Sequence, residues 1–293
     1  MNSLQIIILL VLGALWGASF LFMRVAAPEI GAVWLTELRV LLAGLVLLPW
    51  LFWQRRWTLM RLHARDLFVV GALNSALPFV LIAYITTSVT AGVSSILNAI
   101  VPIVGIVFAY FFAKEKLTWS QLIGVISGFF GVMILMLWQQ AEISSPSPLM
   151  VLAALVASIS YVAGAHYTKQ RLAKIPSIAF VIGTQLAAAI LLLPLLPFFV
   201  PQQYPSMAAV GSIVALAVLS TSLAFIWYFK LIHQIGPTKT LMVTYLVPFF
   251  GMLWGALLLG EVITINQVAG AVLILAGVAL SLNSFSLKNT TKL

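Results

Sequence analysis

Three apolar segments of this sequence each contain a proline that follows a polar side chain by four positions. The pairs are Asn74–Pro78, Asn98–Pro102 and Thr244–Pro248. A proline inside a helix removes the hydrogen bond to the carbonyl group four residues before it. In an apolar environment an unsatisfied carbonyl costs roughly several kcal/mol, so a nearby polar group or a bound solute has to satisfy it. We expect these pairs to line a cavity for a polar solute. The alternative is that the prolines shape packing and the polar residues only repair the backbone.

Other side chains on apolar segments have the chemistry to bind a solute through a ring face or a hydroxyl group. Aromatic faces accept apolar rings or an ammonium group. Serine can bend a helix by bonding back to a carbonyl of the preceding turn, and the run 220–222 stands where the first half of the chain has Pro78. The further cavity candidates are Trp16, Tyr84, Tyr161, Ser222, Trp227 and Tyr245. The alternative for the aromatic residues is anchoring at the membrane surface.

Arg39 is the one basic residue well inside an apolar segment, and Glu37 stands two positions before it. A central arginine costs roughly 2.5–3.5 kcal/mol on insertion scales, so Arg39 has to face protein or water. We favour a structural hydrogen-bond anchor. Binding a substrate carboxylate, gating the outer side and snorkelling to the outer surface are the alternatives. Residues two apart on a helix point to different faces, so we look elsewhere for the partner of Arg39. Glu37 is a candidate carrier of a coupling proton, because burial favours the neutral form of a carboxyl group.

Several kinds of chemistry have no residues to carry them. There is no cysteine, which excludes disulfides, Cys-bound zinc and thiol catalysis. The sequence has no Gly-x-x-x-x-Gly-Lys-Ser/Thr phosphate loop, no group of residues with metal-ligand spacing and no nucleophile beside a base. We therefore expect no catalytic site, no metal, no cofactor and no ATP hydrolysis.

The elements that hold these residues are predicted to be membrane-spanning helices. The chain is 63% apolar and only 7% charged, against about 25% charged residues in a soluble domain. A span needs about 20 mostly apolar residues. Ten segments meet this, at 4–23, 31–53, 67–86, 90–112, 120–138, 149–168, 177–198, 207–229, 237–259 and 265–283.

The net charge of +9 is explained by topology. With the N-terminus in the cytoplasm, thirteen of the fifteen basic residues fall in inner loops. This is the asymmetry that the positive-inside rule describes, so we do not expect nucleic acid binding. We predict an integral membrane protein, in the inner membrane of a bacterium, with both termini cytoplasmic.

A 31-residue stretch occurs twice, 146 positions apart. The first copy has Val101, Pro102, Gly105, Glu115, Thr118, Gln121, Gly124 and Gly131, and the second has the same residue types at 247, 248, 251, 261, 264, 267, 270 and 277. An odd number of predicted spans separates the copies, which turns the second upside down in the bilayer. Lysines flank Glu115 but not Glu261, as opposite membrane faces require. We predict an all-α integral membrane fold of ten transmembrane helices in two inverted five-helix repeats, 1–143 and 144–293.

The chain resembles the EamA branch of the drug/metabolite transporter superfamily. The resemblance rests on the Ala14-Leu15-Trp16-Gly17 run, on Leu38-Arg39 and on the two repeated blocks, and it covers nearly the whole chain. It implies ten helices, cytoplasmic termini, a central cavity between the halves and a scaffold role for the fifth and tenth helices. It also implies export of amino acids, other metabolites or drugs.

These observations predict a secondary transporter, independent of ATP, that moves a small organic solute such as an amino acid or a related compound by alternating access. Export is the expected direction. One alternative is an intramembrane enzyme for a lipid-linked substrate, which would need clustered acid–base residues at one membrane face. Another is a structural membrane protein. Substrate, coupling ion and direction stay open, and so does a homodimer, because small-xxx-small glycine spacing is common in membrane helices.

Overall fold

The computed structural model describes residues 2–53, 57–112, 118–137, 146–201, 204–235, 240 and 242–290. Within these ranges the chain forms helices and turns, and no strand. Six helical stretches are long and apolar enough to cross a membrane, and three shorter apolar helices accompany them. Helix is the expected result, because in lipid each segment has to satisfy its own backbone polar groups.

The first half of the chain covers the first five predicted spans. Its elements are α1 (Ser3–Trp53), α2 (Trp57–Leu62), α3 (Ala64–Gly71), η1 (Ala72–Ala76), α4 (Leu77–Thr86), α5 (Ala91–Asn98), α6 (Val101–Phe112) and α7 (Trp119–Leu137). The π-helical segment η1 joins α3 to α4 in one stretch. The first two predicted spans form the single element α1.

The second half contains α8 (Pro148–Arg171), α9 (Ser177–Leu192), η2 (Leu193–Phe198), α10 (Met207–Ala217), η3 (Val218–Leu223), α11 (Ala224–Ile235), α13 (Val243–Leu259) and α14 (Ile265–Thr290). A second π-helical segment, η3, joins α10 to α11. The two π-helical segments start 146 positions apart, at Ala72 and Val218, which is the spacing of the sequence repeat.

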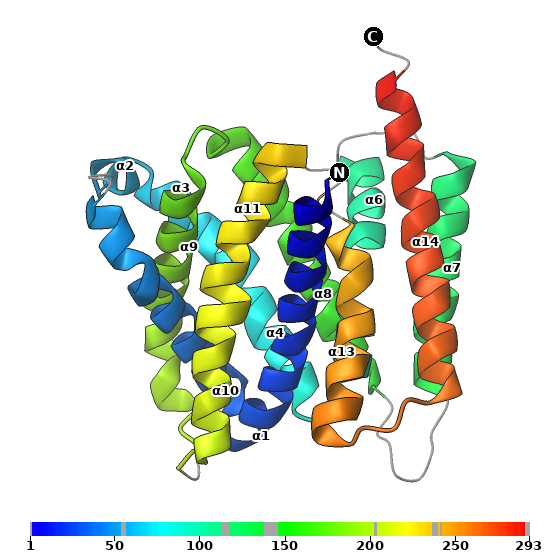
Figure 1. Ribbon diagram of the computed structural model, residues 1–293, viewed down its shortest axis with the longest axis horizontal. Coiled ribbons are helices and arrows are strands. Elements are labelled where there is room, and N and C mark those ends of the chain that lie inside the picture. Colours follow the sequence, from blue (N-terminus) through cyan, green and yellow to red (C-terminus); the bar gives the residue numbers. More distant parts are fainter. Residues whose placement is uncertain are drawn as a thin grey trace.

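α1 consists of two arms that meet at Gly31. Gly31 has φ 78° and ψ 159°, a backbone conformation that glycine adopts without a steric penalty. The first arm descends from the N-terminus and the second arm rises again beside α9 (Figure 1). Figure 1 thus defines two faces: a terminal face, where α1 begins and α14 ends, and a distal face, where the turn of α1 and the α13–α14 connection lie.

Two contacts tie helix ends together near the turn of α1. The Nη1 group of Arg24 donates to the carbonyl oxygens of Thr86, at 3.1 Å, and Thr87, at 2.9 Å, at the end of α4. The Glu29 carboxylate accepts from the backbone N–H of Ser206, at 2.6 Å, and from its hydroxyl, at 2.8 Å. Ser206 is the N-cap of α10. Both contacts therefore join α1 to another helix on the distal face.

Glu261 makes a third contact of this kind. It stands between α13 and α14, and its carboxylate accepts from the backbone N–H groups of Ala91, at 2.9 Å, and Gly92, at 3.4 Å. These are free N–H groups in the first turn of α5, where negative charge is favourable. Glu261 thus bridges the two halves of the chain. Its repeat counterpart, Glu115, lies outside the described residues.

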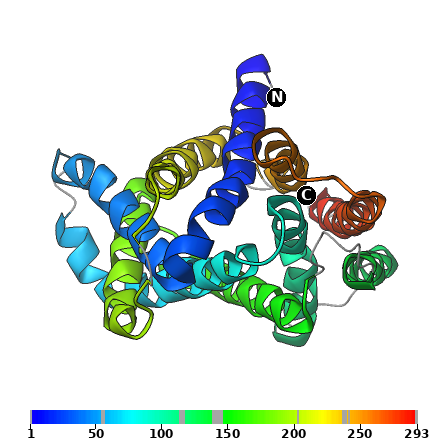
Figure 2. The same cartoon turned by 90° about the horizontal axis from the view of Figure 1, so that it is seen from below.

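α7 and α14 pack against each other at one side of the bundle (Figure 2). Both begin with the same cap, in which a threonine N–H donates to the glutamine three residues later: Thr118 to Gln121 at 2.9 Å, and Thr264 to Gln267 at 3.2 Å. Their side chains away from the contact are exposed large hydrophobic groups such as Phe129, as expected for a surface that faces lipid.

Candidate functional site

A cavity of about 540 Å³ lies among the helices. Both arms of α1 contribute to its wall, together with the stretch from η1 to α4, α5, α6, α8, α9, α11 and α13. α7, α10 and α14 contribute nothing in their described parts. The wall reaches the first turn of α9 and of α13 at Phe180 and Thr244, but includes no residue of 24–38, around the turn of α1.

Arg39 is the only charged residue among the described residues of the cavity wall. Its Nε–H donates to the hydroxyl oxygen of Thr221 at 3.0 Å, and its guanidinium carbon lies 3.7 Å from the centre of the Phe79 ring. Nη1 lies 3.9 Å from the sulfur of Met23. The Thr221 hydroxyl in turn donates to the carbonyl oxygen of Leu216, five residues earlier, at 2.9 Å.

The π-helical segment η3 places that threonine. In a wide turn, a backbone carbonyl lacks the N–H donor that an α-helix places four residues later. A hydroxyl group on the segment can donate a hydrogen bond to this carbonyl instead. The two neighbouring hydroxyls bind α1: Ser220 donates to the carbonyl oxygen of Leu15 at 2.7 Å, and Ser222 lies 3.2 Å from that of Ala43. η3 is therefore fixed to both arms of α1 around the arginine.

The π-helical segment η1 brings amide and hydroxyl groups to the opposite wall. Ser75 accepts a hydrogen bond from Nε2 of Gln185, on α9, at 3.1 Å. The side-chain oxygens of Asn74 and Gln185 are buried and have no hydrogen-bond partner among the described residues. The Asn74 oxygen packs directly on Gly164 of α8, where any larger residue would displace it.

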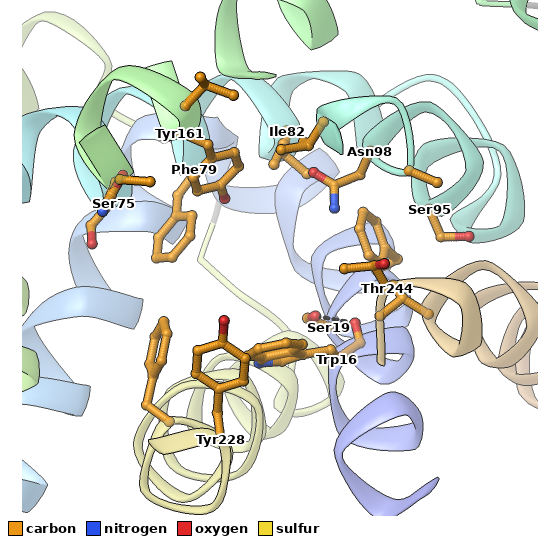
Figure 3. A pocket seen from close by; sticks show the side chains of 18 of the residues that line it. Trp16, Ser19, Ser75, Phe79, Ile82, Ser95, Asn98, Tyr161, Tyr228 and Thr244 are labelled. Carbon is orange, nitrogen blue, oxygen red and sulfur yellow. Dashed lines mark hydrogen bonds between the residues drawn. The ribbon is translucent and has the colours of Figure 1, made fainter. Parts of the chain in front are cut away.

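Aromatic rings face each other across the cavity (Figure 3). Trp16 and Tyr228 lie on one side, with ring centres 5.1 Å apart, and Phe79 and Tyr161 lie on the other, 6.4 Å apart. Asn98 and Thr244 border the space from a third side (Figure 3). The walls therefore offer apolar ring surface with a few polar groups between the rings, as in typical binding sites for small molecules.

The helices take different forms at the three prolines. The helical stretch of the fourth span is interrupted between Asn98 and Val101, immediately before Pro102. Around Pro78 the helix stays continuous but contains the wide turns of η1. α13 runs through Pro248 as helix. Of these three prolines, one thus stands at a helix break, one follows wide turns and one lies within continuous helix.

The predicted site residues divide between the cavity wall and other places. Those on the wall are Trp16, Arg39, Asn74, Asn98, Pro102, Tyr161, Thr244 and Pro248. Those that do not line it are Glu37, Pro78, Tyr84, Ser222, Trp227 and Tyr245. Tyr84 and Tyr245 pack on one hydrophobic cluster and Trp227 on another. The Glu37 carboxylate is buried, without a hydrogen-bond partner among the described residues.

Sequence reasoning missed several wall residues, including Ser19, Ser75, Phe79 and Gln185. A signal existed for Gln185, which is the one amide in the apolar run 177–198. No signal existed for Phe79, because a phenylalanine in a span is as common on a lipid-facing surface as on a cavity wall. In the described part of the chain, no three histidine, aspartate or glutamate residues come together to hold a metal ion.

The sequence profile of the EamA-like transporter family matches residues 4–137 and again residues 148–283. The chain belongs to the EamA-like transporter family. The two matches divide it into halves that each contain five of the predicted spans. Membership and the long apolar helices together make the chain an integral membrane transport protein.

Named relatives agree with this membership. The uncharacterized transporter YoaV of Bacillus subtilis is 26% identical, over 93% of this chain and 94% of its own length. A probable amino-acid metabolite efflux pump of Salmonella typhimurium is 25% identical over 94% of both chains. A probable terminal-alkyne amino-acid exporter of Streptantibioticus cattleyicolor is 29% identical, over 75% of this chain and 74% of its own.

A solved crystal structure has the same fold. It superposes with a TM-score of 0.66, covers 96% of this chain and 97% of its own, and is 19% identical in sequence. At this identity the likeness concerns the arrangement of helices alone.

Proposed function

We propose that this EamA-family protein is a secondary transporter that exports a small organic metabolite, an amino acid or a related compound, by alternating access. The observation that carries the proposal is the cavity, which is enclosed by nine elements from both halves and lined by rings and polar groups. Two of the named relatives are an amino-acid exporter and an amino-acid metabolite efflux pump by their names, which supports the class of solute.

The proposal includes ten membrane spans. They are the two arms of α1, the stretch α3–α4, the pair α5–α6, α7, α8, α9 with η2, the stretch α10–α11, α13 and α14. A helix rises 1.5 Å per residue, so the 17 residues of α13 reach about 26 Å, close to the apolar thickness of a bilayer.

The packing of α7 on α14 supports the inverted relation of the two repeats. A Cβ on Gly131 would lie 2.9 Å from the carbonyl oxygen of Gly270, and a Cβ on Gly277 would lie 2.5 Å from that of Gly124. Gly124 and Gly270 are repeat equivalents, as are Gly131 and Gly277. Each glycine therefore touches the counterpart of the other, which is the pattern of a two-fold axis across an antiparallel helix pair.

A hydrogen bond lies close to this axis. Ser127 donates to the carbonyl oxygen of Leu273, its own repeat equivalent 146 residues later, at 2.7 Å. An axis perpendicular to membrane-spanning helices lies in the plane of the membrane, as inverted-topology repeats require. The equal offset of η1 and η3 supports the same relation.

We further propose that the terminal face is cytoplasmic and that the membrane is the inner membrane of a bacterium. The basic residues of the α8–α9 turn, Lys169, Arg171 and Lys174, lie toward this face. The cavity wall reaches the same face, while the contacts of Arg24, Glu29 and Glu261 join helix ends on the distal face. In this arrangement the solute enters from the cytoplasm.

Transport into liposomes tests the proposal. Purified protein is reconstituted, and uptake of radiolabelled amino acids and related metabolites is followed with and without a pH gradient. We expect flux of at least one solute above protein-free liposomes, and acceleration by the gradient if Glu37 carries a coupling proton. Absence of flux for every solute under every gradient would refute the transporter assignment.

A further inference from the structure

The charge balance of the cavity is uneven. Arg39 is the only charged residue on the described wall, and no carboxylate among the described residues forms an ion pair with it. Arg39 is 7% exposed as a whole residue. An unpaired cation at this depth is unfavourable, so an anion inside the cavity would gain a large share of its binding energy there.

The guanidinium also keeps unused hydrogen-bond donors. It has five N–H bonds in a planar fork. Nε is used by Thr221, and Nη1 faces only the weak sulfur acceptor of Met23. Nη2 makes no hydrogen bond to a described residue, and this nitrogen is not fully buried. An arginine kept only as an anchor would bind carbonyls with these groups, as Arg24 does on the distal face.

Two elements hold the fork in one orientation. The Phe79 ring, on α4, supports the flat face of the guanidinium, and Thr221, on η3, fixes its Nε edge. The terminal edge, with Nη1 and Nη2, is left for a ligand. A carboxylate has two oxygens at the spacing that this edge recognises.

We propose that Arg39 is the anion subsite of the cavity and binds the carboxylate of the transported solute through its terminal nitrogens. This inference rests on the proposed function. The preferred anionic group is a single carboxylate, because it pairs with the one cation of the described wall, whereas a phosphate dianion would leave an unpaired negative charge in the apolar cavity. Phe79 and Thr221 are positioning residues.

The remainder of the wall defines the rest of the solute. Trp16 and Tyr228 present ring surface across the cavity from Phe79 and Tyr161 (Figure 3). Ring faces favour an apolar or aromatic body of moderate size. The expected substrate class is therefore a carboxylic or amino acid with an aromatic or aliphatic side chain.

Matched pairs of probes test the subsite. Binding of 3-phenylpropanoate and 3-phenylpropanamide, and of phenylalanine and its amide, is measured by titration calorimetry on the purified protein. Charge-assisted bonds to a fork predict that each carboxylate binds at least about tenfold more tightly than its amide. Equal affinity within both pairs, or no binding of either carboxylate, would overturn the proposal.

Three variants separate the subsite from general damage. Arg39→Gln is expected to abolish the preference for the carboxylate, and Arg39→Lys to keep only a part of it, since the charge remains without the fork. Phe79→Leu is expected to reduce the preference without removing it. Arg61→Gln, a basic residue of α2 outside the cavity, is the control and keeps the full preference. If Arg39→Gln does not fold, the other two decide the outcome.

Competition in proteoliposomes distinguishes failure of the subsite from failure of the function. If a solute is transported and neither carboxylate competes with it, the carboxylate subsite is wrong and the transporter stands. If carboxylates bind with the expected preference but nothing is transported, the subsite stands and the proposed function falls.

Discussion

Asn98 shows what a single polar residue of the cavity wall is expected to contribute. Its side chain borders the open space, just before the helix break at Pro102 (Figure 3). Replacement by alanine removes one hydrogen-bonding group from solute contact, which corresponds to a loss of about three- to tenfold in transport efficiency. Transport rates at several solute concentrations measure this. Asn266→Ala, on α14 outside the cavity, is the matched control, and an unchanged Asn98→Ala variant would remove Asn98 from the site.

The contact between Gly164 and Asn74 gives a second prediction for single residues. Gly164, on α8, has no side chain, and this leaves room for the amide group of Asn74. A methyl group at Gly164 would collide with the Asn74 side chain and lie 3.0 Å from Cβ of Leu73. Overpacking of this kind costs about 1–3 kcal/mol. We expect Gly164→Ala to lower the thermal unfolding midpoint in detergent and Gly164→Ala with Asn74→Ala to restore most of it. Additive effects of the two substitutions would contradict this coupling.

Among the elements, the Glu261 contact is expected to hold the distal face closed. Glu261→Gln removes the negative charge that faces the N-terminus of α5, which weakens the contact and favours states open to that side. Ala99, on the cavity wall, serves as the reporter. In an Ala99→Cys background, we expect labelling by an impermeant maleimide from the outer side to rise severalfold. Tyr204→Phe, an exposed distal substitution, should leave labelling unchanged, and equal labelling in Glu261→Gln would argue against a closing role.

Most of the elements could be predicted from the sequence, because a span is recognised by length and apolarity alone. Helix covers most of the described residues in the predicted ranges, with exceptions such as the turn at Ala99–Ile100. The π-helical segments could not be predicted. A wide turn contains one extra residue and rotates the helix that follows it. In a helix that is apolar on all sides, this rotation shifts no boundary between apolar and polar faces, so the sequence pattern does not reveal it. The run Ser220-Thr221-Ser222 suggested a bend but not its form.

The same limit applies to the candidate site. Asn74, Asn98 and Thr244 stood out because polar residues are rare in spans, and all three lie on the cavity wall. Tyr84, Trp227 and Tyr245 carried an equally good aromatic signal and lie in packed clusters instead. Which face of a helix an aromatic residue takes depends on neighbours that come from distant parts of the chain. Trp16 and Tyr161 carried the same aromatic signal and do line the cavity, so residue type alone does not select the wall residues.

For the whole molecule, the proposed orientation gives a direct prediction. The chain has no cysteine, so single cysteines can be introduced without removing others. Ala173, in the α8–α9 turn, and Tyr204, before α10, are exposed. The α8–α9 turn and the start of α10 lie at opposite faces (Figure 1). In intact cells, an impermeant maleimide should label Tyr204→Cys and spare Ala173→Cys until the membrane is made permeable. The reverse pattern would place the termini outside.

The glycine contacts also bear on whether the molecule assembles with itself. Gly13 and Gly17 face α13, Gly251 faces α5, and Gly128 faces α6. The glycines whose spacing is compatible with a homodimer thus pack against helices of the same chain. Any self-association would have to use other surfaces, which size measurements in detergent can detect.

The crossing of α7 with α14 has a consequence for how the protein is made. The glycine face of α7 leaves the ribosome more than a hundred residues before its partner does. Until α14 arrives, that face can only meet lipid or the membrane-insertion machinery. The contact surface of α7 therefore stays uncovered when the first half has been made, and α14, the last helix to be synthesised, covers it. A chain that stalls before Ile265 would leave Gly124 and Gly131 without the helix that packs on them.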